Sequence, residues 1–296
     1  MTRQPGLRAA NASQLGPTMD VRPLLRQLGL RPSRHRGQSF LVDGSVVGTI
    51  LAEAELTKDD TVLEVGPGLG VLTSGLAERA GRVIAVEIEP RLVAHLRKSL
   101  AIFPNVQVIE GDILSLGAGR MGGGDANDWL ALPRGYKVVA NIPYAITSAL
   151  LRHFLEAVVP PERLVLMVQK EVAQRVVAKP GRMSILAVSV QLYGETRLAA
   201  VVPARAFYPV PQVDSAILRV DVLPQPRVVV EPRRFFRVVA AGFHLKRKQL
   251  KNALASGLAL PQQRIAEVLQ ATGIDGRRRA ETLSVEEWGI LAEAVP

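Results

Sequence analysis

The residues with the most evident chemistry are Asn141, Ile142, Pro143 and Tyr144, which directly follow the apolar run 138–140. A strand that ends in a turn is the simpler interpretation, since Asn and Pro are common turn residues. The same residues also suit a slot for a planar ring with an exocyclic amine, such as adenine. The side-chain oxygen of Asn141 and the carbonyl of Ile142 or Pro143 could accept the two N–H bonds of that amine, and Pro143 aims its carbonyl because its φ is fixed.

Such a slot would make a poor nucleophile reactive by geometry. The lone pair of a ring-conjugated amine is delocalised, but it points outward once both N–H bonds are held and the nitrogen becomes pyramidal. Tyr144 would stack on the ring, an interaction worth about 1–3 kcal/mol per base. Direct attack on a held methyl group is mainly a matter of positioning. No strong general base is needed, because the nitrogen becomes acidic only as the new bond forms.

Three glycines, Gly66, Gly68 and Gly70, follow the expected buried strand 61–65. Glycines let the backbone turn tightly and let a ligand lie against it, because no Cβ stands in the way. The spacing is G-x-G-x-G and not the G-x-G-x-x-G of dinucleotide-binding proteins, which makes a bound pyrophosphate less favoured. A glycine turn alone is a weak indication of any ligand.

Two acidic residues strengthen this ligand site. Glu87 comes 21 residues after Gly66, at the end of the next expected strand, where a carboxylate can accept both hydroxyls of a ribose. Asp112 follows the third expected strand and could accept a hydrogen bond from the exocyclic amine of a base. Both could instead be ordinary acids at helix N-termini. We favour an adenosine-type site, because open α/β sheets bind ligands at this edge.

The elements that must position these residues alternate between strand and helix from residue 60 onward. This alternation predicts an α/β fold with a mainly parallel sheet covered by helices on both faces. Two later β-rich stretches, 184–193 and 215–222, are expected to close one edge as a hairpin, and the Gly-rich stretch 117–135 is expected to be a loop. The other expected elements are strands 61–65, 82–86, 106–109, 136–140 and 164–168, and helices 71–79, 90–100, 147–157 and 170–178.

Three parts are expected along the chain. Residues 1–18 read as a flexible tail, which contains Arg and no acids, as a transit peptide would, but lacks the apolar core of a secretory signal. Residues 19–222 form the catalytic α/β domain. Residues 223–296 begin with a Pro-containing linker, 224–232, and form a small basic helical domain. Its expected helices are 233–242, 247–256, 262–272 and 285–294.

Composition excludes several classes of protein. The 296 residues include no Cys, so disulfides and thiolate metal sites are excluded, and the four His residues show no metal-ligand spacing. There is no apolar run of about 18 residues, so no membrane span is expected. The formal net charge of +10 divides into +6 over residues 1–38, +5 over 223–296 and −1 between them. Basic ends favour a nucleic-acid partner over a surface that is merely solvated.

Taken in order, the glycine turn, Glu87, Asp112 and the 141–144 group resemble S-adenosylmethionine-dependent adenine-N6 methyltransferases. Further stretches narrow the resemblance to the bacterial small-subunit (16S) rRNA adenine-N6 dimethyltransferases, the group associated with kasugamycin sensitivity. These stretches are GQSFL (37–41), MVQKEVA (167–173), FYPVPQVDSA (207–216), residues 243–254 and RAETLS (279–284). The resemblance therefore covers most of the chain, from about residue 31 to 284.

The resemblance implies a Rossmann-like class I S-adenosylmethionine-dependent methyltransferase domain with a seven-stranded sheet, followed by an all-helical rRNA-binding domain. It implies a cytoplasmic monomer that dimethylates N6 of two adjacent adenines in the 3′-terminal hairpin loop of 16S rRNA. S-adenosyl-L-methionine would be the methyl donor, and neither a metal nor a membrane would take part. The partner would be 16S rRNA within a 30S precursor particle, late in small-subunit assembly. Loop bases are unpaired, so extruding one costs little.

The resemblance also implies roles for individual residues. Asn141, Pro143 and Tyr144 would hold the target base, and Phe207 would stack on its other face. The residues around the methyl donor would be Ser39, Leu41, Gly66, Gly68, Gly70, Glu87, Asp112 and Asn141. Two positions depart from the family pattern: Ser39 stands where the family usually has Asn, and the stretch 183–186 replaces a Tyr-Gly pair.

Three other functions remain open at this point. The nearest is a sister enzyme that methylates one adenine of 23S rRNA and confers macrolide resistance, although the complete MVQKEVA and F-x-P-x-P stretches favour the small-subunit type. A second is a non-catalytic ribosome-assembly or transcription factor on the same fold, which the intact slot and glycine turn argue against. A third is a small-molecule enzyme similar to spermidine synthase, which would explain the donor site but not the basic ends.

Overall fold

The computed structural model describes residues 19–32, 39–115 and 132–296. The tail expected over residues 1–18 and most of the loop expected over 117–135 lie outside the described residues. The positions discussed below therefore come from the three described ranges.

Two compact units make up the described chain. The first extends to Ala173 and also includes Arg197–Val222, while the second combines Gln174–Thr196 with Leu223–Pro296. The segment Gln174–Thr196, which the sequence suggested for the α/β part, thus groups with the C-terminal helices. The assignment of one part to catalysis and the other to rRNA binding stays a prediction.

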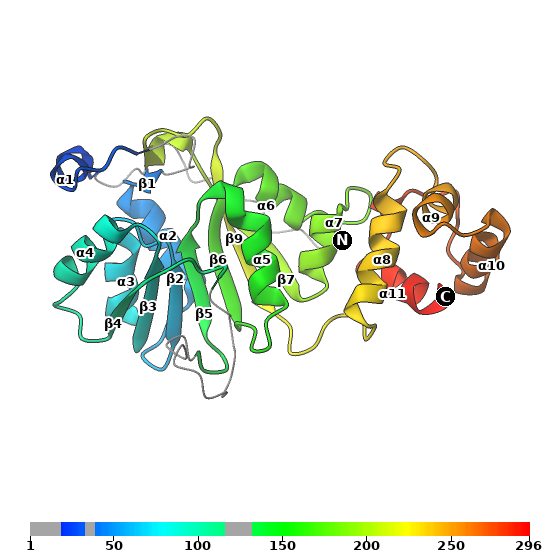
Figure 1. Ribbon diagram of the computed structural model, residues 1–296, viewed down its shortest axis with the longest axis horizontal. Helices are drawn as coiled ribbons and strands as arrows, with labels where there is room; N and C mark the ends of the chain where they lie inside the picture. The colour runs from blue at the N-terminus through cyan, green and yellow to red at the C-terminus, as the bar shows by residue number, and fades with distance from the viewer. Residues whose placement is uncertain (1–18, 33–38, 116–131) are drawn as a thin grey trace, which may run out of the picture. The chain divides into compact units, whose positions relative to one another are not determined.

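A seven-stranded sheet forms the first unit, with the strand order β4-β3-β2-β5-β6-β9-β7 (Figure 1). The first five strands in this order are parallel, and β9 runs antiparallel to β6. The five expected parallel strands are thus confirmed, with their carboxyl ends at one edge of the sheet. The bounds are β2 (Thr61–Val65), β3 (Arg82–Glu87), β4 (Val106–Glu110), β5 (Lys137–Asn141), β6 (Arg163–Gln169), β7 (Gly194–Val202) and β9 (Ser215–Val222).

The strand at the β7 edge comes from a different stretch than the sequence indicated. Residues 184–193, expected to be β-rich, contain the helix α7 (Ile185–Gln191). β-Branched residues in this stretch favour a strand, but Ser184 caps a helix because its hydroxyl accepts the Ala187 N–H at 3.2 Å. Its buried residues recur at helical spacing and belong to one apolar cluster; they are Met183, Ala187, Val188 and Leu192. Burial therefore outweighs local propensity here.

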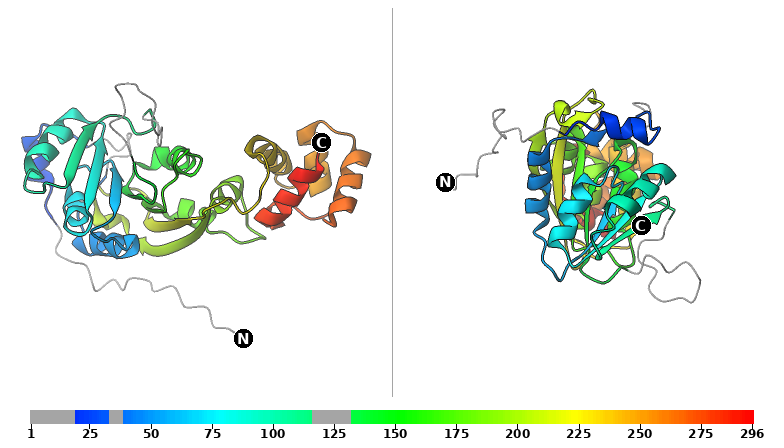
Figure 2. Two further views of the ribbon diagram at one scale, coloured as in Figure 1. Left: turned by 90° about the horizontal axis from the view of Figure 1, so that it is seen from below. Right: turned by 90° about the vertical axis from the view of Figure 1, so that its left-hand side faces the viewer.

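Helices cover both faces of the sheet. α2 (Gly44–Ala54) and α3 (Val71–Arg79) share an apolar cluster with Val62, Val83 and Val139 from three strands. Because side chains alternate between the faces of a strand, the intervening residues point to the opposite face, on which α5 lies (Figure 1, Figure 2). The further helices are α1 (Arg22–Gln27), α4 (Pro90–Ser99), α5 (Thr147–Leu155) and α6 (Lys170–Val176).

A group of ion pairs holds the end of α2 at the sheet edge opposite to the carboxyl ends. Arg219 Nη1 lies 2.6 Å from Glu55 Oε1, and Arg163 Nη1 lies 2.8 Å from Glu55 Oε2. The guanidiniums of Arg219 and Arg163 lower the pKa of Glu55 to about 2. Both arginines also contact Asp221 at the end of β9. The charged network therefore lies away from the edge where a ligand is expected.

The second unit contains four long helices around a buried tryptophan, as the sequence predicted for a helical C-terminal part. Trp288 is 0% exposed, and a Cβ at Gly242 would lie only 2.3 Å from its ring, which explains the glycine. Pro232, expected in a linker, is the first residue of a helix, a position that suits proline. The helices are α8 (Pro232–Phe243), α9 (Leu250–Leu258), α10 (Gln262–Thr272) and α11 (Val285–Ala294). None of the described helices is long and apolar enough to span a membrane.

Candidate methyl-donor and adenine site

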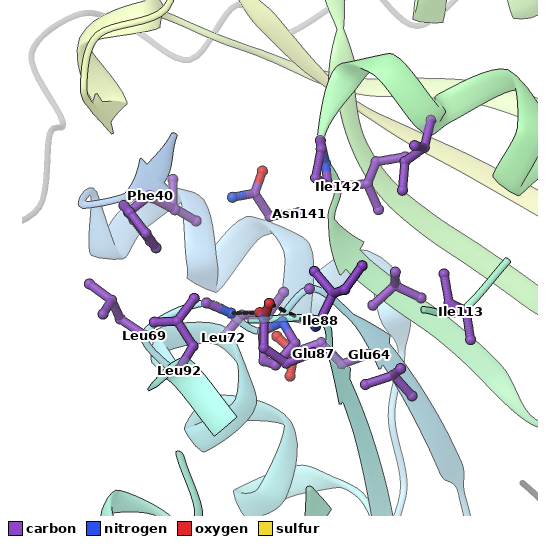
Figure 3. A pocket seen from close by; sticks show the side chains of 18 of the residues that line it. Phe40, Glu64, Leu69, Leu72, Glu87, Ile88, Leu92, Ile113, Asn141 and Ile142 are labelled. Atoms are coloured by element: carbon purple, nitrogen blue, oxygen red, sulfur yellow. Dashed lines mark hydrogen bonds between the residues drawn. The ribbon is translucent and has the colours of Figure 1, made fainter. Parts of the chain in front are cut away.

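A cavity of about 340 Å³ opens at the carboxyl ends of the parallel strands (Figure 3). Most of the residues that the sequence suggested for the site line this cavity. They are Ser39, Leu41, Gly66, Gly68, Glu87, Asp112, Asn141 and Pro143. Gly70, Tyr144 and Phe207 are not among the lining residues. All of the lining residues belong to the first unit.

The glycine turn forms one wall of the cavity, and its backbone requires glycine. Gly66, Gly68 and Gly70 have φ of +66°, +59° and +83°, which lies in the left-handed region that other residues rarely adopt. A Cβ at Gly66 would lie 3.9 Å from Pro143 Cδ and 4.0 Å from the Asn141 backbone oxygen. The turn after β2 and the end of β5 therefore converge on the same space.

Gly70 supports the turn from behind rather than facing the cavity. It is the residue before α3, and a Cβ at this position would lie 2.9 Å from Leu96 Cδ2. In this structure it lets the start of α3 approach Leu96 of α4 closely.

Glu87 is buried at the end of β3 and held in place by the backbone. Its Oε2 accepts the Gly68 N–H at 3.1 Å, and its Oε1 accepts the N–H groups of Ile88 and Glu89 at 2.9 and 3.0 Å (Figure 3). Burial raises the pKa of Glu87, while these three N–H groups act against that rise by stabilising the carboxylate. A fixed carboxylate beside the glycine turn suits the hydroxyls of a ribose.

Asp112 lies in the loop after β4 and lines the cavity with its apolar neighbours. Its Oδ1 accepts the Leu114 N–H at 3.0 Å. Ile88 and Ile113 also line the cavity, and both lie near Glu87 in Figure 3. These apolar walls were missed from the sequence, although each isoleucine directly follows one of the predicted acids. They suit the faces of an adenine ring, and Asp112 would accept a hydrogen bond from the amine of that ring.

Glu64, at the inner wall of the cavity, is a second feature that sequence reasoning missed. It is 1% exposed, and its Oε2 has no hydrogen-bond partner among the described residues. Burial raises its pKa to about 8, so the carboxyl group is mostly protonated at neutral pH. A charged residue inside an apolar strand was the available signal.

Asn141 ends β5 with its side chain in the cavity. Figure 3 shows its amide in the space between Phe40 and Ile142, above the glycine turn. Pro143 follows and precedes a short 3₁₀ turn, Tyr144–Ile146. The Pro143 carbonyl accepts the Ile146 N–H at 3.2 Å, so one of its two lone pairs is already engaged. The amide and the glycine turn thus face a common space, as an amine-binding slot beside a donor requires.

The two predicted stacking rings lie outside the cavity wall. The Tyr144 hydroxyl is 2.6 Å from Ser215 Oγ, which anchors its half-buried ring to the start of β9. Phe207 is 2% exposed and belongs to the apolar cluster with Leu41 and Ala206. To stack on a base, Phe207 would have to leave that core. Stacking by either ring stays a prediction.

Ser39, Phe40 and Leu41 form the roof of the cavity, and the last two belong to a two-stranded ladder. β1 (Phe40–Leu41) pairs antiparallel with β8 (Phe207–Tyr208). A Cβ at Gly68 would lie 3.3 Å from Phe40 Cδ1, so the Phe40 ring lies against the glycine turn. Ser39 Oγ donates a hydrogen bond to the Pro209 backbone oxygen at 3.0 Å. Phe40 was not singled out in the sequence, although it lies between two predicted site residues.

The donor set favours a nucleoside ligand over a metal. Within the described ranges, no group of His, Cys, Asp and Glu side chains could hold a metal ion. In S-adenosylmethionine, the ribose would suit Glu87 and the adenine would suit the walls formed by Ile88 and Ile113. The glycine turn leaves room for the ligand to lie against the backbone. The residues present therefore fit this methyl donor.

Comparisons with known proteins agree with this chemistry. The chain matches the family described as "Ribosomal RNA adenine dimethylase" over residues 31–295. It is 48% identical over 264 residues to the "Ribosomal RNA small subunit methyltransferase A" of Dehalococcoides mccartyi, which covers 88% of each chain. It is 45% identical over 280 residues to the protein of the same name from Moorella thermoacetica, covering 92% of this chain and 95% of the other.

Two solved structures resemble the fold. The 23S rRNA methyltransferase ErmE is 32% identical with a TM-score of 0.68, covering 86% of this chain and 98% of its own. A dimethyladenosine transferase from Plasmodium falciparum has a TM-score of 0.72 at 24% identity, covering 85% of this chain and 95% of its own. At that identity the second likeness concerns the fold alone.

Proposed function

Since this chain belongs to the ribosomal RNA adenine dimethylase family, whose methyl donor is S-adenosylmethionine, we propose that its substrate is the 3′-terminal hairpin loop of 16S rRNA. There it dimethylates N6 of two adjacent adenines within a 30S precursor particle, late in small-subunit assembly. The observation that carries this proposal is the convergence of the Asn141 amide and the glycine turn on one cavity. We further propose a cytoplasmic location, where ribosomal subunits are assembled, and a monomer.

Sequence identity supports 16S rRNA over 23S rRNA as the substrate. The two relatives named as small-subunit methyltransferases are 48% and 45% identical to this chain, whereas the 23S rRNA methyltransferase is 32% identical. The MVQKEVA and FYPVPQVDSA stretches point in the same direction. Both chemistries share one slot, so the difference lies in which RNA is presented to it.

The chain's own residues would act by holding the target amine in position. The Asn141 side-chain oxygen accepts one N–H bond of the target amine, and the Ile142 or Pro143 carbonyl accepts the other. The donor supplies a methyl group bonded to a sulfonium. As the nitrogen–carbon bond forms, the carbon–sulfur bond breaks and the amine loses a proton to solvent. Positioning of this kind can supply several kcal/mol of the barrier lowering.

The substrate assignment is tested by mapping methyl groups. Purified protein is incubated with labelled S-adenosylmethionine and 30S particles from a strain that lacks the modification, with 23S rRNA as the matched alternative. We expect label only in 16S rRNA, at N6 of two neighbouring adenines of the 3′-terminal hairpin. Label in 23S rRNA would establish the sister activity instead. Binding to 30S particles without transfer would establish a non-catalytic assembly factor.

A basic surface of the second unit is proposed to contact rRNA phosphates. The exposed residues Lys246, Arg247 and Lys248 come just before Gln249, the residue that precedes α9. Leu250 N–H donates to the Arg278 carbonyl at 2.7 Å, which brings this segment beside the basic stretch 277–279. In that stretch Arg277 pairs with Asp275 and Arg278 with Glu287, while Arg279 is exposed. Basic residues that are distant in the sequence therefore lie together, which suits a phosphate-binding surface.

We expect the affinity for 16S rRNA to fall steeply with salt and to lose part of that slope in the triple variant Lys246→Gln/Arg247→Gln/Lys248→Gln. Each lost phosphate contact should reduce the log–log salt slope by about 1. Filter binding from 50 to 300 mM salt measures this. Arg264→Gln is the matched control, since Arg264 is on the same unit but lies 3.1 Å from Glu267. Equal slopes in the triple variant and the wild type would contradict the assignment of this surface.

A further inference from the structure

We propose that Ser39 is a positioning residue that couples the donor cavity to the loop that receives the target base. The inference rests on the proposed function, because it takes the cavity as the methyl-donor site. It is carried by the partly buried hydrogen bond of 3.0 Å from Ser39 Oγ to the Pro209 backbone oxygen. This bond joins two segments that are 170 residues apart in the sequence.

On the donor side, Ser39 belongs to the roof of the cavity. Ser39, Phe40 and Leu41 all line it. The Phe40 ring lies against the backbone of Gly68, where an added Cβ would come within 3.3 Å. A donor seated on the glycine turn must therefore contact this roof and limit its motion.

On the acceptor side, Pro209 belongs to the loop between β8 and β9. Tyr208, the last residue of β8, is 36% exposed and Val210 in the loop is 52% exposed, and neither lines the cavity. At its other end, Ser215 Oγ is hydrogen-bonded to the Tyr144 hydroxyl at 2.6 Å. The loop that bonds to Ser39 is therefore also bonded to the tyrosine of the target-base slot.

The two sides are connected by a short ladder that Ser39 extends. Leu41 lies opposite Phe207 in the ladder, and the Val42 N–H donates to the Ala206 carbonyl at 2.9 Å. These backbone bonds form with almost any side chain. The Ser39 side chain instead bonds to the loop beyond the ladder. Removing its hydroxyl therefore breaks the link to the loop and leaves the ladder intact.

Coupling of this kind is reciprocal in binding free energy. A bound donor that fixes the roof, and through it the loop, strengthens rRNA binding by some factor. Bound rRNA must then strengthen donor binding by that same factor. We expect a factor of roughly five, at the lower end of the usual range for coupled sites. Ser39 acts through Pro209 and does not need to touch the target base.

The test compares Ser39→Thr with Ser39→Val, two side chains of nearly equal shape that differ in the hydroxyl. For each variant and the wild type, calorimetry gives the affinity for S-adenosylhomocysteine with and without saturating 30S particles that lack the modification. Any direct effect of residue 39 on the donor appears in both measurements and cancels in their ratio. We expect a ratio of about five for the wild type and Ser39→Thr, and a ratio near one for Ser39→Val.

Several outcomes would overturn the proposal. A wild-type ratio near one would show that the two sites are not coupled. An unchanged ratio in Ser39→Val, with affinity lowered equally in both measurements, would make Ser39 a donor contact only. Since S-adenosylhomocysteine cannot react, these results are independent of methyl transfer. Failure of the wild type to bind 30S particles would instead remove the proposed function and this inference together.

Discussion

Replacing Asn141 by alanine is expected to lower kcat for rRNA methylation by about 10³-fold. The substitution removes the acceptor that would hold one N–H bond of the target amine, so the lone pair is no longer aimed at the methyl group. Loss of a single preorganised hydrogen-bonding group in an active site typically costs 10²–10³ in turnover, and misplacement of the reacting atoms adds to this. Single-turnover transfer of labelled methyl groups to unmodified 30S particles measures the effect.

Two comparisons separate chemistry from folding in this prediction. Calorimetry with S-adenosylhomocysteine should show a much smaller loss of donor affinity than of turnover. Asn105→Ala is the matched control, because its part-buried amide donates to the Ala77 and Ala80 carbonyls and does not line the cavity. If Asn141→Ala retained more than a tenth of the wild-type turnover, the amide would not be the group that holds the target amine.

Tyr144→Ala is expected to lower kcat/KM for rRNA by about 5- to 150-fold, because stacking of one base on an aromatic ring is worth about 1–3 kcal/mol. Donor affinity should change far less, since Tyr144 does not line the cavity. Steady-state methylation and calorimetry with S-adenosylhomocysteine give the two quantities.

Tyr144→Phe separates the ring from its anchor. It keeps the stacking face but removes the hydroxyl that is 2.6 Å from Ser215 Oγ. We expect this variant to lose much less activity than Tyr144→Ala. Equal losses of activity and donor affinity in Tyr144→Ala would argue against base stacking. The corresponding Phe207→Ala change is less informative, because emptying this core position should cost about 3–5 kcal/mol of stability.

The parts of the site that the sequence predicted obey local rules. A buried strand, a turn that requires positive φ and an acid at the next strand end follow each other within about 25 residues, and parallel strands bring such ends to one edge. Gly66, Glu87 and Asn141 could therefore be placed together without knowing the packing of the molecule. The confirmed helices likewise follow from periodic apolar residues.

The features that were missed depend on contacts between distant segments. Residues 185–191 have β-branched side chains, but their burial on one side of a helix decides their structure. The ladder between β1 and β8 joins short segments that have no periodic pattern of their own. Phe207 lies in a recognisable motif, yet its burial follows from packing that no local pattern encodes.

The cavity is completed by residues between 39 and 146, less than half of the chain, while the exposed loop after β8 and the basic second unit come later. We propose that the earlier stretch binds the methyl donor and holds the target amine, while the later one decides which RNA is presented to it. Substitutions that redirect the protein to another RNA would then fall mainly in the later stretch, outside the residues that line the cavity. A lineage with this layout can change its substrate without rebuilding its reaction.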